Sequence, residues 1–246
     1  MRKFQLDQNF LRSPRLALFL IGHSNIKKKD LVIDLGAGSG VITSALARRC
    51  KKVIAIEKDP ETARKLRENL KRQEIANVEI FVGDFREMKL PNEPYKIFSN
   101  PPFSLSAEVF YKLLDLKNQD GRIIEKNSEE HRRPDAIYLI LQKQLALKLI
   151  ITERHYTSQL GRILAKNYTT KIRLPLKETD FTPPPRVPTV LFEAKIISLN
   201  LLQESAQHSY NPSKYATNDI WWIKTYNACK YAKQQYHPWI FCFRRN

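Results

Sequence analysis

Short apolar runs rich in β-branched residues alternate with stretches of helical periodicity along most of this chain. The apolar runs with the character of buried strands lie at residues 31–36, 53–57, 78–83, 95–100 and 136–141. The helical stretches that separate and follow them lie at residues 41–50, 60–73, 107–116 and 142–150. Two more β-like runs, 171–176 and 189–197, follow closely and can pair as a hairpin at one edge. This alternation predicts an α/β fold with a doubly wound, mostly parallel sheet of seven strands, because strands joined through helices run parallel.

Two segments depart from this alternation. Residues 117–135, KNQDGRIIEKNSEEHRRPD, are polar and highly charged, and they predict an exposed, mobile loop between a helix and the fifth strand. After about residue 198 the composition changes to helical stretches that carry large aromatic side chains, among them Trp221, Trp222 and Trp239. We therefore expect one main domain over residues 1–197 and a small helical C-terminal region over residues 198–246.

The charge of the chain points to a polyanionic partner. The formal net charge is +17, which is more than solubility requires, and it favours nucleic acid or an anionic membrane surface. The N-terminal MRKFQLDQNF lacks the apolar core of a signal peptide, and no apolar run reaches membrane-spanning length, so we expect nucleic acid and no membrane. Basic groups that can contact phosphates, although each alone is also explained as a solvated face, are Arg12 with Arg15, Lys27–Lys29, Arg48 with Arg49, Lys51 with Lys52, and Arg132 with Arg133.

The cysteines bear on the compartment and on metal binding. The three of them, Cys50, Cys229 and Cys242, are far apart and show no C-x-x-C spacing. This pattern argues against a disulfide framework and against a zinc site. We therefore expect a protein of the reducing cytoplasm that uses no metal, and a monomer by default.

A glycine-rich turn follows the first predicted strand directly. The segment DLGAGSG places Asp34 ahead of Gly36, Gly38 and Gly40, at the strand end where doubly wound sheets bind ligands. Its G-x-G-x-G spacing differs from the G-x-G-x-x-G dinucleotide fingerprint. The Asp34 carboxylate would repel a pyrophosphate and attract an amino group. The motif therefore favours S-adenosylmethionine over NAD.

Carboxylates also end the next two predicted strands. Glu57 follows VIAI and can take both hydroxyls of a ribose, and Asp84 in the segment VGDF can accept a hydrogen bond from the amine of an adenine. Each carboxylate alone is explained better by a solvated strand end or a helix cap than by a ligand. Three such strand ends in sequence order favour a cofactor site.

The fourth strand ends in FSNPPFSLS, residues 98–106. Prolines are common where a helix begins, so a stiff turn is one explanation of this loop. The other is catalytic: the Asn100 side-chain oxygen and the Pro101 carbonyl can accept both hydrogens of an amine, and the Phe103 ring can stack on the flat ring that carries it. Such hydrogen bonds favour a tetrahedral nitrogen, which lowers the barrier to methyl transfer.

Together these motifs resemble the ribosomal RNA adenine-N6 methyltransferases, the family of the Erm and KsgA enzymes. The resemblance runs from QNFL (8–11) through DLGAGSG, AIEKD, VGDF and NPPF to FTPPPRVPTVLF (181–192), about three quarters of the chain. It implies a Rossmann-like S-adenosylmethionine-dependent methyltransferase fold. The catalytic residues that it implies are Asn100, Pro101 and Phe103. The implied contacts to the cofactor are Asn9, Leu11, Gly36, Gly38, Glu57, Asp84 and Asn100.

The resemblance also implies contacts to the RNA. The family motif F-x-P-x-P-x-V occurs here from Phe181 to Val187, next to the expected pocket for the target base, so Phe181 is a substrate contact together with Phe103. Pro183 and Pro185 are explained as a loop into the last hairpin. Arg12, Arg132 and Arg133 are the basic residues that we assign to substrate phosphates.

Two branches of the family compete for this chain. KsgA-like enzymes usually read N-L-P-Y at the catalytic loop, whereas some Erm-like resistance enzymes read N-P-P-F, as here at residues 100–103. We therefore favour mono- or dimethylation of an adenine in 23S rRNA, with macrolide–lincosamide–streptogramin resistance. The alternative is a KsgA-like 16S rRNA dimethyltransferase of small-subunit assembly.

Other functions fit single motifs less completely. An amide-Pro-Pro-aromatic loop also serves adenine-N6 DNA methyltransferases and protein-glutamine methyltransferases, but neither is expected to carry QNFL together with F-x-P-x-P-x-V. A more remote alternative is an RNA-binding ribosome-assembly factor that kept the fold and lost catalysis. The intact glycines and Asn100 argue against it.

Overall fold

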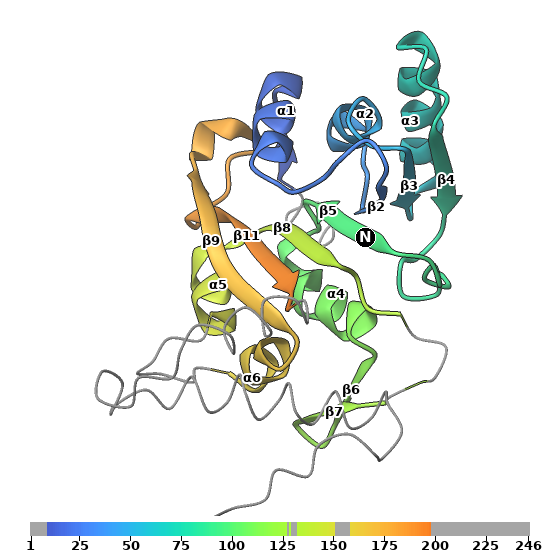
Figure 1. Ribbon diagram of the computed structural model, residues 1–246. Helices are drawn as coiled ribbons and strands as arrows, with labels where there is room; N and C mark the ends of the chain where they lie inside the picture. The colour runs from blue at the N-terminus through green and yellow to red at the C-terminus, as the bar shows by residue number, and fades with distance from the viewer. Residues whose placement is uncertain (1–8, 127, 129–131, 151–157, 198–246) are drawn as a thin grey trace, which may run out of the picture.

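A twisted central sheet forms the middle of the described part of the molecule (Figure 1). The computed structural model describes residues 9–126, 128, 132–150 and 158–197. Within them, the central sheet has seven strands in the order β4-β3-β2-β5-β8-β11-β9. Their bounds are β2 Leu31–Leu35, β3 Lys52–Glu57, β4 Val78–Val82, β5 Tyr95–Ser99, β8 Ala136–Gln142, β9 Tyr168–Leu176 and β11 Thr189–Ile196.

The strand order confirms the doubly wound sheet that the sequence predicts. Strands β4, β3, β2, β5 and β8 pair in parallel, and the chain moves outward from β2 first in one direction and then in the other. The order in which strands are added reverses between β2 and β5, and in such sheets ligands bind at the carboxyl ends of the two strands that flank this switch. The predicted hairpin is also confirmed, because β11 pairs antiparallel with both β8 and β9.

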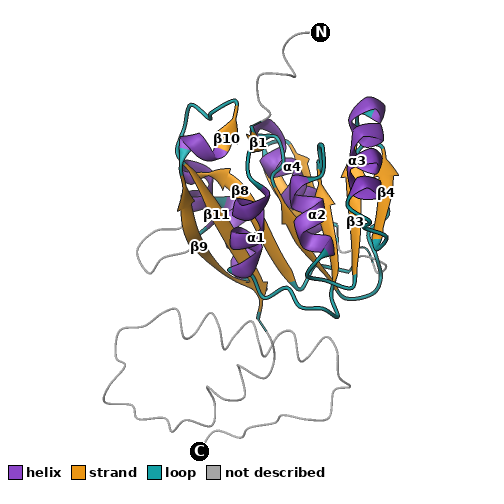
Figure 2. Ribbon diagram, turned by 90° about the horizontal axis from the view of Figure 1, so that it is seen from above, coloured by secondary structure: helices purple, strands orange, loops and turns teal. Residues whose placement is uncertain are grey.

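Helices cover both faces of the sheet, so the fold has three layers (Figure 2). On one face, helices α1 and α2 pack over buried residues of β2, β8 and β11, and α3 packs beside them. On the other face, α4, α5 and α6 bury Phe110, Leu149 and Leu164 against the sheet. The helices span α1 Pro14–Gly22, α2 Val41–Ala47, α3 Pro60–Arg72, α4 Ser106–Leu113, α5 Lys143–Leu149 and α6 Gln159–Ala165.

Two parts of the fold differ from the sequence-based expectation. The charged segment 117–135 is not all loop, since β6 (Leu116–Gln119) and β7 (Arg122–Glu125) pair as an antiparallel hairpin. Glu125 of this hairpin bonds Arg133 and Lys166, so opposite charges order a polar segment. Helix α1 was not predicted, although its start has a sequence signal: the Ser13 side chain accepts from Leu16 N, and a proline occupies the first turn. The expected helical region 198–246 lies outside the described residues.

Small elements complete the described chain. Strand β1 (Phe10–Leu11) pairs antiparallel with β10 (Phe181–Thr182), which joins two segments far apart in the sequence. Two short 3-10 turns are η2 (Phe103–Leu105) and η3 (Glu178–Asp180). None of the described helices is long and apolar enough to cross a membrane.

The two strands at the centre of the sheet separate at their carboxyl ends. Strand β2 pairs with β5 from Leu31 to Ile33 only. Beyond that point the buried Ser99 hydroxyl accepts from Leu35 N at 2.9 Å and donates to Leu35 O. One side chain thus replaces the backbone ladder, because the backbone groups of a buried strand need partners. The loops that follow β2 and β5 are free to diverge around a pocket.

Ser99→Ala should therefore destabilise the protein by about 1–3 kcal/mol, since it leaves the buried N–H and C=O of Leu35 without a partner. Urea unfolding followed by circular dichroism measures the change, with Ser39→Ala on the exposed glycine loop as the control. A loss no larger than that of the control would contradict the bridging role of the Ser99 hydroxyl.

Candidate active site

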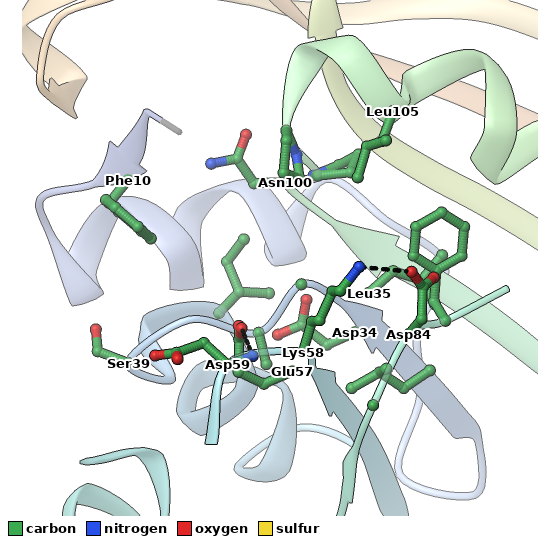
Figure 3. Close-up of a pocket in the computed structure, with 18 of the residues that line it drawn as sticks. Phe10, Asp34, Leu35, Ser39, Glu57, Lys58, Asp59, Asp84, Asn100 and Leu105 are labelled. Carbon is green, nitrogen blue, oxygen red and sulfur yellow. Dashed lines mark hydrogen bonds and ion pairs between the residues drawn. The ribbon is translucent and has the colours of Figure 1, made fainter. Parts of the chain in front are cut away.

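A pocket of about 1200 Å³ lies at the carboxyl ends of the parallel strands. Its walls come from β1, from the loops that follow β2, β3, β4 and β5, and from the first turn of α4. Figure 3 shows Phe10 and Asn100 on one side of this space and the carboxylates on the other. The glycine-rich turn, the carboxylates that end β3 and follow β4, and the loop after β5 are thus brought to one rim of the sheet, as parallel strands require.

Glu57 fixes the glycine loop. Its carboxylate is 8% exposed and accepts from the backbone of Gly38 at 2.8 Å and of Asp59 at 3.0 Å. Gly38 has a φ of +57°, and a Cβ there would lie 3.2 Å from the Phe10 ring, so glycine meets both the backbone and the packing requirement. A Cβ on Gly36 would lie 3.7 Å from Pro102 Cδ, which places the glycine loop against the catalytic loop.

Asp34 is a buried carboxyl with one free oxygen. It is 1% exposed, and Thr43 donates to its Oδ2 at 2.7 Å. Its Oδ1 is buried without a hydrogen-bond partner among the described residues. Burial, with a smaller contribution from the charge of Glu57, raises the pKa of Asp34 to about 7. A cationic group placed at Oδ1 would satisfy the free oxygen and favour the ionised form.

Asp84 has the opposite surroundings. Arg86 donates to it through Nε at 2.9 Å, through Nη2 at 2.5 Å and through its backbone N–H at 3.0 Å. Lys58 adds a bond at 3.1 Å, marked by a dashed line in Figure 3. The Arg86 guanidinium holds the pKa of Asp84 well below its usual range, so this carboxylate is an acceptor at any working pH.

Asn100 faces the pocket from the end of β5. Its side-chain nitrogen donates to the backbone oxygen of Asn9 at 2.7 Å. Its side-chain oxygen is buried and has no partner among the described residues. Asn9 is thereby attached to the loop after β5, and the orientation of the amide leaves an acceptor directed at the pocket.

The other expected contacts fall into two groups. Asn9, Leu11, Gly36 and Pro101 line the pocket, whereas Gly38 does not, and the contacts of all five with a ligand stay predictions. Phe103 is half-buried in turn η2 and is not among the lining residues, so its stacking on a target base stays a prediction.

Phe181 is 1% exposed and pairs with Leu11 in the core. Phe181 thus supports β1 through strand pairing and through the core. A contact between its ring and the RNA stays a prediction.

The basic residues assigned to the substrate are not all near this pocket. Arg12 is exposed next to β1, and its backbone bonds Asp180 at 2.9 Å. Arg132 and Arg133 lie before β8, where Tyr95 at the start of β5 donates to the backbone oxygen of Arg132. They therefore lie at the amino ends of the parallel strands, whereas the pocket lies at the carboxyl ends. Arg133 is also engaged by Glu125 at 2.8 Å.

Several lining residues were missed by the sequence analysis. Phe10 lies on the glycine loop, and its signal was the aromatic residue within QNFL itself. Lys58, Arg86 and Glu108 form ion pairs around Asp84. Their charges are unremarkable in the sequence, because what joins them is the approach of two loops to the first turn of α4.

Known proteins resemble this chain both in sequence and in fold. The family described as ribosomal RNA adenine dimethylase matches residues 1–216. The chain belongs to the ribosomal RNA adenine dimethylase family. The resemblance to the Erm and KsgA enzymes is thus confirmed, and the methyltransferase fold with it.

Individual members of the adenine dimethylase family match over different lengths. A dimethyladenosine transferase of Saccharomyces cerevisiae is 26% identical over 214 residues, which are 85% of this chain and 61% of that protein. A probable ribosomal RNA small subunit methyltransferase A of Methanosarcina barkeri is 40% identical over 115 residues, 47% of this chain and 39% of that protein. The chain thus spans less than two thirds of these relatives.

Two solved methyltransferase structures share the fold. A dimethyladenosine transferase from Plasmodium falciparum gives a TM-score of 0.64 at 21% identity, covering 80% of this chain and 67% of that one. The 23S rRNA methyltransferase ErmE gives 0.64 at 20% identity, covering 77% and 70%.

S-adenosylmethionine is the methyl donor of this family, and the residues present fit it. The free oxygen of Asp34 suits its amino group and the Glu57 carboxylate its ribose. The Asp84 carboxylate suits its adenine amine once the exposed Lys58 side chain leaves that carboxylate. A side chain at Gly38 would press on the Phe10 ring, which lines the pocket. Among the described residues, no group of His, Cys, Asp and Glu is arranged to hold a metal ion.

The affinity for S-adenosylhomocysteine should rise with pH up to about pH 7 and then level off. Below the raised pKa of Asp34, binding of the ligand ammonium requires loss of the carboxyl proton, which weakens affinity about tenfold per pH unit. Calorimetry between pH 5.5 and 7.5 measures this slope. Asp34→Asn should bind more weakly and without the slope, whereas a slope that persists in this variant would assign the titration to another group.

Proposed function

We propose that this chain transfers methyl groups from S-adenosylmethionine to N6 of an adenine in ribosomal RNA. The observation that carries the proposal is the Asn100 side-chain oxygen, which is buried without a hydrogen-bond partner in the described part of the chain, beside a pocket that suits the methyl donor. Membership of the adenine dimethylase family supports the same reaction.

The Asn100 amide suits an amine that reacts as a nucleophile. The N6 lone pair of adenine is conjugated with the ring, so the amine attacks poorly until its nitrogen becomes tetrahedral. An oxygen that accepts an N6 hydrogen favours that change and stabilises the charge that develops on nitrogen. Because Asn9 holds the amide nitrogen at 2.7 Å, the oxygen is preorganised and need not reorient during the reaction.

Two ribosomal RNAs compete as the substrate. Pro101 at the catalytic loop favours 23S rRNA, as the sequence analysis infers, and ErmE, a 23S rRNA methyltransferase, shares the fold. The second candidate is small-subunit rRNA, supported by relatives named small subunit methyltransferase A. The second candidate rests on several relatives, whereas the first rests on one loop residue and a fold.

Asn100→Ala should lower methyl transfer to rRNA by a factor of about 100 or more, since one preorganised hydrogen-bond partner of the reacting group is lost. The measurement is incorporation of labelled methyl groups into total rRNA. S-adenosylhomocysteine should still bind, which calorimetry checks.

Asn118→Ala is the matched control, because Asn118 is exposed on β6, away from the pocket. Equal turnover in the Asn100 variant and in the control would exclude Asn100 from the chemistry.

Primer extension across 23S and 16S rRNA after the reaction should give a stop at one adenine, and the molecule that carries it identifies the substrate. Dimethylation of N6 removes both amine hydrogens and blocks pairing, which produces the stop. Resistance to macrolides on expression would accompany a 23S stop only. Transfer to duplex DNA or protein, with none to rRNA, would contradict the proposed substrate class.

A further inference from the structure

A chain of ion pairs crosses the rim of the pocket at the end expected to hold adenine. Lys58 contacts Asp84 at 3.1 Å, Arg86 contacts Asp84 at 2.5 Å, and Arg86 Nη1 contacts Glu108 at 2.8 Å. We call these four residues the rim ion chain. It joins the loops after β3 and β4 to the first turn of α4.

Arg86 is the centre of the rim ion chain. Its guanidinium uses Nε and Nη2 on Asp84 and Nη1 on Glu108. The bond to Asp84 is bidentate, a geometry that the five fixed donors of arginine allow and the single ammonium of lysine does not. Helix α4 also holds the Arg86 backbone, since Lys112 donates to its carbonyl oxygen at 2.8 Å.

The partners of Asp84 show which contact a ligand would replace. Its two oxygens accept four hydrogen bonds, three from Arg86 and one from Lys58, which leaves no lone pair for an adenine amine. The Lys58 side chain is 72% exposed and makes one bond to Asp84, so it is the partner that can leave. Arg86 then remains the group that orients the carboxylate.

Helix α4 begins where the catalytic loop ends. Asn100, Pro101 and Pro102 lead into turn η2, and Ser106 opens the helix. A side chain that fixes the first turn of α4 therefore also fixes the far end of the loop that carries Asn100.

We propose that Arg86 is a positioning residue that couples the adenine end of the cofactor pocket to the catalytic loop, through Asp84 on one side and Glu108 on the other. The proposal rests on the proposed function, because it assumes an adenine at Asp84. Arg86 touches neither the reacting amine nor the methyl group, so it acts through the groups it orients.

This role is one of orientation and not of stability. Arg86 is 49% exposed and Glu108 is 38% exposed, and ion pairs at such exposure add little to the free energy of unfolding. A variant that breaks the Arg86–Glu108 pair should therefore fold normally. Its effect should appear only when the pocket is occupied.

Hydrogen exchange with and without S-adenosylhomocysteine tests the coupling. In the wild-type protein the ligand should slow exchange of the α4 amides Val109–Leu113 by about fivefold beyond the slowing at β8, whose buried amides report global unfolding. In Glu108→Gln and in Arg86→Lys the extra slowing should fall below about twofold. In Glu108→Gln the calorimetric affinity should stay within about threefold, since Asp84 keeps its bidentate contact with Arg86.

Arg64→Gln is the matched control. Arg64 makes two exposed ion pairs, with Glu61 and Glu68 of α3, so the variant breaks comparable surface ion pairs away from the catalytic loop. It should behave as the wild type. Extra slowing that persists in both rim variants would overturn the proposal, as would its loss in the control.

Kinetics adds a readout that a merely structural role would not move. Glu108→Gln should lower kcat about fivefold to tenfold and leave KM for S-adenosylmethionine nearly unchanged, because the adenine contact survives and the loop is released. A parallel change in both constants would overturn the coupling. A wild-type protein that binds S-adenosylhomocysteine but methylates no rRNA would contradict the proposed function and leave the exchange test in place.

Discussion

The separation of β2 from β5 is the constraint on which the site depends. Both strands are fully buried, so their backbone groups must be paired, yet they must part to admit a ligand at the switch in strand order. The Ser99 hydroxyl resolves this by pairing both backbone groups of Leu35 where the ladder stops. The glycine loop and the catalytic loop then leave the sheet on either side of one space, with Gly36 facing Pro102.

Electrostatics divides this space into two ends. Asp34 is desolvated and has a free oxygen, so its pKa is raised and it gains most from a positive group. Asp84 is surrounded by Arg86 and Lys58, so it remains ionised and accepts from a neutral donor. Two carboxylates of one rim thus suit an ammonium and an adenine amine, which are the two ends of one S-adenosylmethionine molecule.

Much of the site was predicted because strand ends converge. The acidic residues Asp34, Glu57 and Asp84 each follow a short apolar run, and parallel pairing brings such positions to one edge. The prediction failed where side chains cross between loops or where a segment is ordered by distant charges. Arg86 is one of 42 Lys and Arg residues and is distinguished only by its contacts with Asp84 and Glu108. The hairpin β6–β7 was missed because its ordering by Arg133 and Lys166 is tertiary.

The sequence by itself determined the sheet, its order of elements and the strand ends that carry chemistry, because periodicity and glycine spacing are local properties. Tertiary structure alone decided which atoms are left free. The Asn100 oxygen is available because its nitrogen is held by Asn9, and β1 is held by its pairing with β10, more than 160 residues further along the chain. Tertiary structure also buried Phe181, which pairs with Leu11. It placed Arg132 near the amino ends of β5 and β8, at the opposite end of the strands from the pocket. Such contacts follow from burial and from the meeting of distant segments, which no local pattern encodes.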